Sequence, residues 1–234
     1  MPTDPHAAPR ALRAFLLAVL LAAAVTGCGG GGGSSSASSS SPAATTTAST
    51  SSTASTPAQG QLGFEGMPLE TGPDLAPAST TGTAVVDGIQ CGLTEQLAYH
   101  IHAHLQVYVN GAARALPGGI GIPGSTVEQT SVGPVAQGGQ CIYWLHTHAP
   151  DGVIHIESPT QRIYTLGQFF DEWRQPLGPN QVAGAKGKVT ALVDGQRWSG
   201  DPRQIKLTPH AVIQLDVGSP APAFRNVSWA GTQL

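Results

Sequence analysis

The fold is decided by one stretch of the chain, residues 99–109, which reads YHIHAHLQVYV. Apolar and polar side chains alternate along it, and this period of two indicates a β-strand with one buried face. Asn110 and Gly111 follow directly and are typical of a two-residue hairpin turn, so we expect a return strand over residues 112–116. The polar face of the strand carries three histidines: His100, His102 and His104.

Further short strands and one helix follow. We expect hairpins over residues 141–157 and 188–199, and a last apolar strand over residues 211–217. The helix should begin at Thr165, which forms a capping box with Gln168 and precedes an aromatic stripe at helical spacing. Together these elements predict a mainly β domain, an antiparallel sandwich or open barrel with one short helix.

The N-terminal third is expected to lie outside the folded core. Residues 1–27 join a basic flank to a short Leu/Ala-rich run, which is typical of an export signal. Residues 25–28, VTGC, resemble a bacterial lipobox, which implies a lipoprotein anchored through a lipid on Cys28 to the extracytoplasmic face of a bacterial membrane, in the cell envelope. An ordinary secretory signal is the alternative. We expect a lipidated, disordered Gly/Ser/Thr/Pro-rich stalk over residues 28–84 and the histidine-rich β domain over residues 85–234.

The two cysteines of the expected domain, Cys91 and Cys141, are predicted to form a disulfide. The export signal would place them in an oxidising compartment. Separate buried thiols or thiolate metal ligands are the alternatives. Neither cysteine is in a Cys-x-x-Cys motif, which counts against a redox centre and a structural zinc site.

The composition argues against several other functions. Only 11% of the residues are charged and the net charge is −3, so no basic surface is available to neutralise a phosphate backbone, and nucleic-acid binding is not expected. The chain has no Gly-x-Ser-x-Gly nucleophile motif and no phosphate-binding loop.

The strongest functional signal is the clustering of histidines. Residues two apart on a strand project to the same face about 6.6 Å apart, so their imidazoles can converge on one ion. The turn over residues 149–152 should place His146 opposite His155 and His148 opposite Val153. The predicted metal ligands are His100, His102, His104, His146, His148, His155 and Glu157.

This imidazole-rich set, with oxygen neighbours and no thiolate, suits Zn(II) or Cu(II). For any single histidine, a position on a solvated face beside a carboxylate is the alternative. His210 is isolated in the sequence and is expected to be structural.

Several segments together resemble an uncharacterised exported histidine-rich domain family of prokaryotes. They read YHIHAHL (residues 99–105), WLHTH (144–148), GVIHIES (152–158) and TLGQFF (165–170). The resemblance covers about residues 90–218 and implies a domain boundary but no activity.

Three functions stay open on the sequence. The first is an envelope-anchored lipoprotein that binds Cu or Zn through its histidines for buffering, delivery or sensing. The second is a zinc-dependent hydrolase or lyase in which Glu157 or Asp151 acts as general base, and an open site in a cleft would favour it. The third is a non-catalytic interaction or scaffold module, and histidines dispersed over the surface would favour that function.

Overall fold

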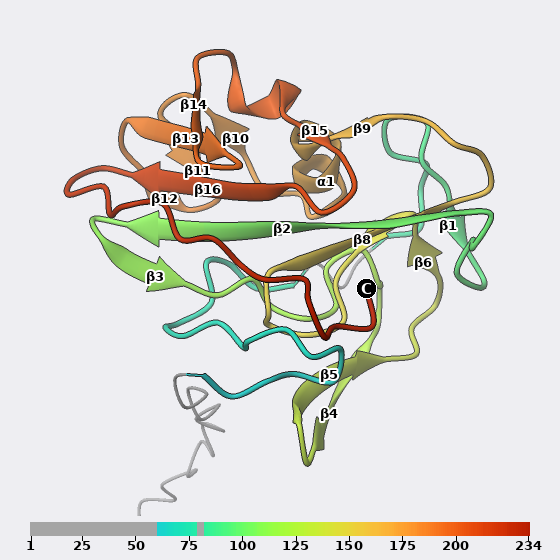
Figure 1. Cartoon of the computed structure of the whole chain (residues 1–234). Coiled ribbons are helices and arrows are strands. Elements are labelled where there is room, and N and C mark those ends of the chain that lie inside the picture. Colours follow the sequence, from blue (N-terminus) through green and yellow to red (C-terminus); the bar gives the residue numbers. More distant parts are fainter. Residues whose placement is uncertain (1–59, 79–81) are drawn as a thin grey trace, which may run out of the picture. The chain divides into compact units, whose positions relative to one another are not determined.

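The computed structural model describes residues 60–78 and 82–234 (Figure 1). The predicted export signal and the predicted lipidation of Cys28 lie outside these residues. None of the helices formed by the described residues has the length and apolar character of a membrane span.

A seven-stranded sheet built around β2 (Tyr99–Val109) is the centre of the fold. Its other strands are β3 (Ala112–Arg114), β7 (Leu145–His146), β8 (Val153–Ser158), β13 (Val189–Val193), β14 (Gln196–Trp198) and β16 (Val212–Val217). The strand order is β14-β13-β16-β2-β8-β7, and β3 also pairs with β2. The paired strands are antiparallel except β2 and β16, a parallel pair that the sequence did not predict.

Four smaller sheets surround the central one. Their strands are β1 (Cys91–Gly92) with β6 (Ile142–Tyr143), β4 (Thr126–Thr130) with β5 (Gly133–Gln137), β9 (Tyr164–Thr165) with β15 (Lys206–Leu207), and β10 (Leu177–Gly178), β11 (Gln181–Val182) and β12 (Ala185–Lys186). The described part is therefore mainly β with sandwich-like antiparallel sheets and no closed barrel, which confirms the predicted fold class.

The turn chemistry that the sequence indicated is present. Asn110 and Gly111 both have positive φ, 50° and 80°, as the turn between β2 and β3 requires. Asp194 and Gly195, between β13 and β14, have φ of 50° and 78°. These two pairs fix the register of both hairpins.

The α-helix α1 (Leu166–Glu172) packs against one face of the central sheet, and its buried side chains form part of the core there. Thr165 is its N-cap and forms the predicted capping box with Gln168. A 3₁₀-helix, η1 (Pro202–Gln204), precedes β15. The buried aromatic residues of this core are Phe169, Phe170, Trp173 and Tyr164. Odd-numbered residues of β2 such as Ala103 and Leu105 join this core, so the even-numbered histidines face the other side.

The segment over residues 60–78 packs against the domain, so the prediction that everything before residue 85 is a stalk is wrong for this segment. Met67 is completely buried and Leu69 is 3% exposed. The backbone of Glu70 donates to Pro150, and Figure 1 shows the segment on the side of β2 away from α1. Burial of these apolar side chains favours docking of the segment against the domain.

The second predicted hairpin is shorter than expected. His146 pairs with His155 as predicted, but β7 ends there, so the predicted pairing of His148 with Val153 is wrong. The next residue, Thr147, donates its backbone N–H to Ile120 and its hydroxyl to Pro117 instead of to β8. These bonds draw the chain out of the sheet after His146.

The disulfide between Cys91 and Cys141 is confirmed, with the two Cα atoms 5.4 Å apart. It ties the adjoining strands β1 and β6, which pair through Cys91 and Tyr143. Because both thiols are used in this bond, neither Cys91 nor Cys141 offers a thiolate to a metal ion.

Candidate metal centre

Three histidines lie side by side on three adjacent strands of the central sheet. His155 on β8 pairs with His102 on β2 on one side and with His146 on β7 on the other. The ring centroid of His155 is 4.7 Å from that of His102 and 5.1 Å from that of His146. Regular strand pairing therefore positions these three imidazoles in one row on one face.

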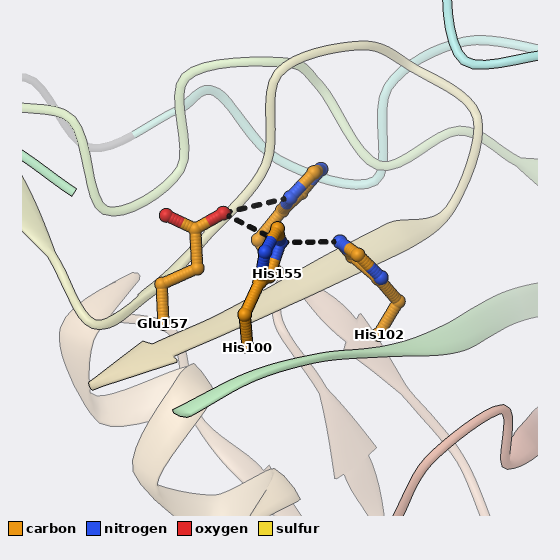
Figure 2. Close-up of side chains that lie close together, drawn as sticks. All are labelled: His100, His102, His155 and Glu157. Carbon is orange, nitrogen blue, oxygen red and sulfur yellow. Dashed lines mark hydrogen bonds and ion pairs between the residues drawn. The ribbon is translucent and has the colours of Figure 1, made fainter. Parts of the chain in front are cut away.

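A second row lies two residues further along the same strands. His100 on β2 pairs with Glu157 on β8, and His100 Nε2 is 3.1 Å from Glu157 Oε1. Figure 2 shows the side chains of His100, His102, His155 and Glu157 turning toward one another. His100 Nε2 is 3.0 Å from His102 Nε2. The same Glu157 oxygen is 3.3 Å from His155 Nδ1, so the two rows converge.

His148 reaches the cluster from the loop that follows β7. Its Nε2 is 3.1 Å from His146 Nε2, and its ring is edge-on to His155 at 4.7 Å between centroids. On its outer side, His148 Nε2 is 3.3 Å from Glu95 Oε1. A loop histidine and a loop carboxylate thus extend the site beyond the sheet.

These side chains form three overlapping groups that could hold a metal ion, each with its ligand atoms within 4.8 Å of one another. The groups are His100, His102, His155 and Glu157; His146, His148 and His155; and Glu95, His146 and Glu157. The structure therefore brings together every predicted ligand except His104.

Two of the histidines are oriented by groups outside these sets. His146 Nδ1 is 2.9 Å from the backbone oxygen of Tyr143. Because a carbonyl only accepts, Nδ1 carries the proton of neutral His146 and Nε2 presents its lone pair to the cluster. His155 Nε2 lies 3.2 Å from Glu65 Oε1, the carboxylate–histidine arrangement that orients many metal ligands.

Burial keeps most of these imidazoles neutral. Desolvation, reinforced by the repulsion of neighbouring histidines, lowers the pKa of His102 to about 3 and holds the pKa of His146 well below its ordinary value. Burial also lowers the pKa of His148. Since a metal binds the unprotonated imidazole, these side chains are competent ligands at neutral pH.

His155 is the exception. Burial acts to lower its pKa, but hydrogen bonds to Glu157 and Glu65 outweigh burial and raise the pKa to about 9. Two carboxylates therefore hold a proton on His155, and a metal that binds it has to displace that proton.

A cavity of about 390 Å³ adjoins the cluster. It is lined by His100, His102, His148, His155 and Glu157, together with apolar residues such as Phe64 and Ile122. The His100 side chain is 40% exposed, while His146 is completely buried. The cluster is therefore buried at His146 and open to the cavity at His100, where a small molecule can reach it.

His104, which was also predicted as a ligand, belongs to none of the three groups. It lies on the same face of β2 as His102 but pairs with Val153, where β8 begins. A Cβ on Gly152 would lie 2.7 Å from His104 Nε2 and 3.0 Å from Glu70 Oε1, so the ring packs beside that turn. Burial lowers the pKa of His104 to about 4.

Two other residues from the sequence analysis also lie outside the three groups. Asp151 is completely buried, accepts the backbone N–H of Val153 and does not line the cavity, which does not suit a general base acting there. Burial, with the nearby charge of Glu65, raises its pKa to about 7. His210 stacks on Trp229 with 4.6 Å between ring centroids.

No sequence pattern pointed to Glu65 and Glu95. Glu65 lies in the segment that was expected to be a stalk, and Glu95 lies in the loop before β2. Neither residue stands in a periodic pattern. Acidic residues are scarce in this chain, with 14 Asp and Glu in 234 residues, and this scarcity is the one signal that could have singled them out.

No protein-family model, curated protein or solved structure matches the chain.

Proposed function

We propose that this protein binds Zn(II) or Cu(II) through its clustered histidines. The observation that carries the proposal is the convergence of five imidazoles and Glu157 from β2, β8, β7 and the loop after β7. Dispersed surface histidines, which would favour a scaffold, are not what the structure shows, since His102, His146 and His155 are all buried.

The spacing of the nitrogens supports a metal. Two imidazole nitrogens bound to one tetrahedral zinc at about 2.0–2.1 Å lie about 3.3–3.4 Å apart. The Nε2 atoms of His100 and His102 are 3.0 Å apart, and those of His146 and His148 are 3.1 Å apart. Small side-chain adjustments would bring both pairs to coordination geometry.

The types of donor atom favour zinc or copper over other metal ions. Imidazole nitrogens suit zinc and copper, whereas calcium and magnesium prefer an all-oxygen shell. The cysteines of the described part form the disulfide, and Met67 is completely buried and belongs to none of the groups. A soft thiolate or thioether site for Cu(I) is therefore disfavoured.

A second candidate function is metal-dependent hydrolysis or elimination. The observation that favours it is the cavity beside the cluster, whose volume of about 390 Å³ is in the range of small-molecule sites. A metal-bound water facing that cavity would have a lowered pKa, and a cluster carboxylate would accept its proton.

We further propose that the protein is a lipoprotein of the bacterial cell envelope, anchored through Cys28. The lipobox-like residues 25–28 support this, and the disulfide fits an oxidising compartment outside the cytoplasm. Radiolabelled palmitate should be incorporated into the chain, and the substitution Cys28→Ser should abolish both labelling and recovery in the membrane fraction.

Metal analysis of the full chain, purified without a polyhistidine tag, tests the main proposal. We expect Zn or Cu to co-purify, and titration calorimetry on the metal-stripped chain to show tight binding. The double substitution His102→Ala with His146→Ala should weaken that binding at least 100-fold, because it removes two nitrogens from the central row. The matched control His210→Ala removes a histidine outside the groups and should leave the affinity unchanged. Equal affinity in all three proteins would contradict the proposal.

A further inference from the structure

We propose that the cluster is a two-ion centre in which the Glu157 carboxylate bridges the ions. This inference rests on the proposed metal binding and adds the number of ions and the role of the bridging residue.

The ligands divide into two sets on opposite sides of Glu157 and His155. One set comes from β2, where His100 and His102 present nitrogens 3.0 Å apart. The other comes from β7 and its loop, where His146 and His148 present nitrogens 3.1 Å apart. Strand β8 lies between β2 and β7, so its side chains stand between the two nitrogen pairs.

Glu157 has the orientation that a bridge requires. Its Oε1 is 3.1 Å from His100 Nε2 in the first set, and its Oε2 is 3.9 Å from His146 Nε2 in the second. The side chain is 3% exposed, yet Oε2 is buried with no hydrogen-bond partner in the described part of the chain. A buried carboxylate oxygen without a partner is costly, and a metal ion between it and His146 would satisfy it.

The number of donors exceeds what one ion uses. Zinc in proteins is almost always bound by four ligands, whereas this site offers five imidazoles together with Glu157 and Glu95. Two ions would share them as His100, His102 and Glu157 on one side and His146, His148, Glu95 and Glu157 on the other. His155 lies within reach of both sides, because it belongs to a group on each.

Three carboxylates contact the histidines of the cluster: Glu65, Glu95 and Glu157. Their combined charge of −3 lies midway between the charges of one and two divalent ions, so two ions fit the site as well as one, and the donor count decides between them. Ions bridged in this way lie about 3.5–4 Å apart in known two-metal sites, which is close enough to hold one small molecule between them.

The stoichiometry of the full chain tests this inference. Metal-stripped protein saturated with Cu(II) or Zn(II) and then desalted should retain two ions per chain. With Cu(II), coupling between the bridged ions should quench or broaden the EPR signal relative to that of isolated Cu(II).

Paired variants then separate the two positions. His100→Ala with His102→Ala should lose one ion and keep the other, and so should His146→Ala with His148→Ala. Glu157→Gln, which replaces the bridging carboxylate with an amide, should abolish the coupling. Its matched control Glu128→Gln changes an exposed glutamate on β4 and should retain two coupled ions.

The outcomes distinguish this inference from the proposed function. Retention of one ion per chain by the parent protein, lost in both double variants, would overturn the two-ion centre and leave metal binding intact. Retention of no metal by the parent protein would overturn both. Two ions without magnetic coupling would overturn the bridging role of Glu157.

Discussion

Glu65 and His155 are 90 residues apart in the chain, yet Glu65 Oε2 lies 3.3 Å from His155 Nε2. The contact joins the N-terminal segment to the middle strand of the histidine cluster. Glu65 therefore contacts His155, the histidine that belongs both to the group with His100 and His102 and to the group with His146 and His148. The segment over residues 60–78 is therefore part of the site as well as part of the fold.

The first prediction concerns the orienting role of Glu65. Glu65→Gln keeps the size of the side chain but removes the charge that holds the His155 ring. Loss of such an orienting partner typically costs 10–100-fold in metal affinity, and we expect a loss of about that size. Competition titrations with a chromophoric chelator would measure it. Glu128→Gln serves as the control, and an unchanged affinity in Glu65→Gln would show that Glu65 does not orient His155.

The second prediction concerns pH. Hydrogen bonds to Glu157 and Glu65 outweigh burial and raise the pKa of His155 from 6.5 to about 9 in the metal-free protein. The folded state then binds this proton more tightly than the unfolded state, so the contribution to stability is complete below about pH 6.5 and is lost as the pH rises through about 9. NMR titration of the metal-free protein should show His155 titrating near 9, and nearer its ordinary value in Glu65→Gln.

Thermal melts give an independent check of the same linkage. The difference in Tm between the parent protein and Glu65→Gln should be largest near pH 6 and should shrink toward pH 9.5. A difference that grows with pH would mean that His155 is neutral in the folded protein.

The main strands and turns of the sheet, and the face on which most of its histidines lie, could be predicted from local sequence. Alternation in residues 99–109, the Asn110-Gly111 turn and the Thr165 capping box are short-range signals, and the structure contains each of them. The pairing of His146 with His155 also follows from the length of the intervening turn. These features depend on neighbours in the chain, which is why sequence patterns report them.

The rest of the site depends on contacts between distant segments. Pairing of β8 with β2 places His102 opposite His155, and no local pattern specifies which strand lies beside β8. His104 shares the polar face with His102, but the Gly152 turn and Glu70 surround it instead of the cluster. Docking of Met67 and Leu69 against the domain brings Glu65 into the site, although the composition around them is typical of a linker.

The third prediction concerns the disulfide. Its cysteines are 50 residues apart, and the loop-entropy model gives about 4 kcal/mol of stabilisation for a loop of that length. Cys91→Ala with Cys141→Ala should therefore lower the free energy of unfolding by about that amount, measured by urea titration. A reducing agent should destabilise the parent protein and leave the double variant unaffected. Equal stability of the two proteins under oxidising conditions would contradict the prediction.

The fourth prediction concerns Glu172 on α1, a buried carboxyl in the core away from the histidine face. The residue is 3% exposed, and neither of its oxygens has a hydrogen-bond partner in the part of the chain that the structure describes. Burial, reinforced by the negative charge of Asp87, raises its pKa well above the ordinary value of 4.5. The folded protein thus holds a proton that the unfolded chain releases, so stability present below about pH 4.5 is lost as the pH rises toward the folded-state pKa.

Glu172→Gln keeps the shape of that side chain and removes its ionisation. We expect the variant to have a higher Tm than the parent protein at pH 7.5, by about 2–4 °C for each kcal/mol gained in the free energy of unfolding. This gain in Tm should disappear near pH 4. Calorimetric melts at the two pH values measure this, with the exposed Glu128→Gln as the control at both. A lower Tm for Glu172→Gln at pH 7.5 would show that the native carboxyl is ionised and paired, because only then would neutralising it remove a favourable interaction.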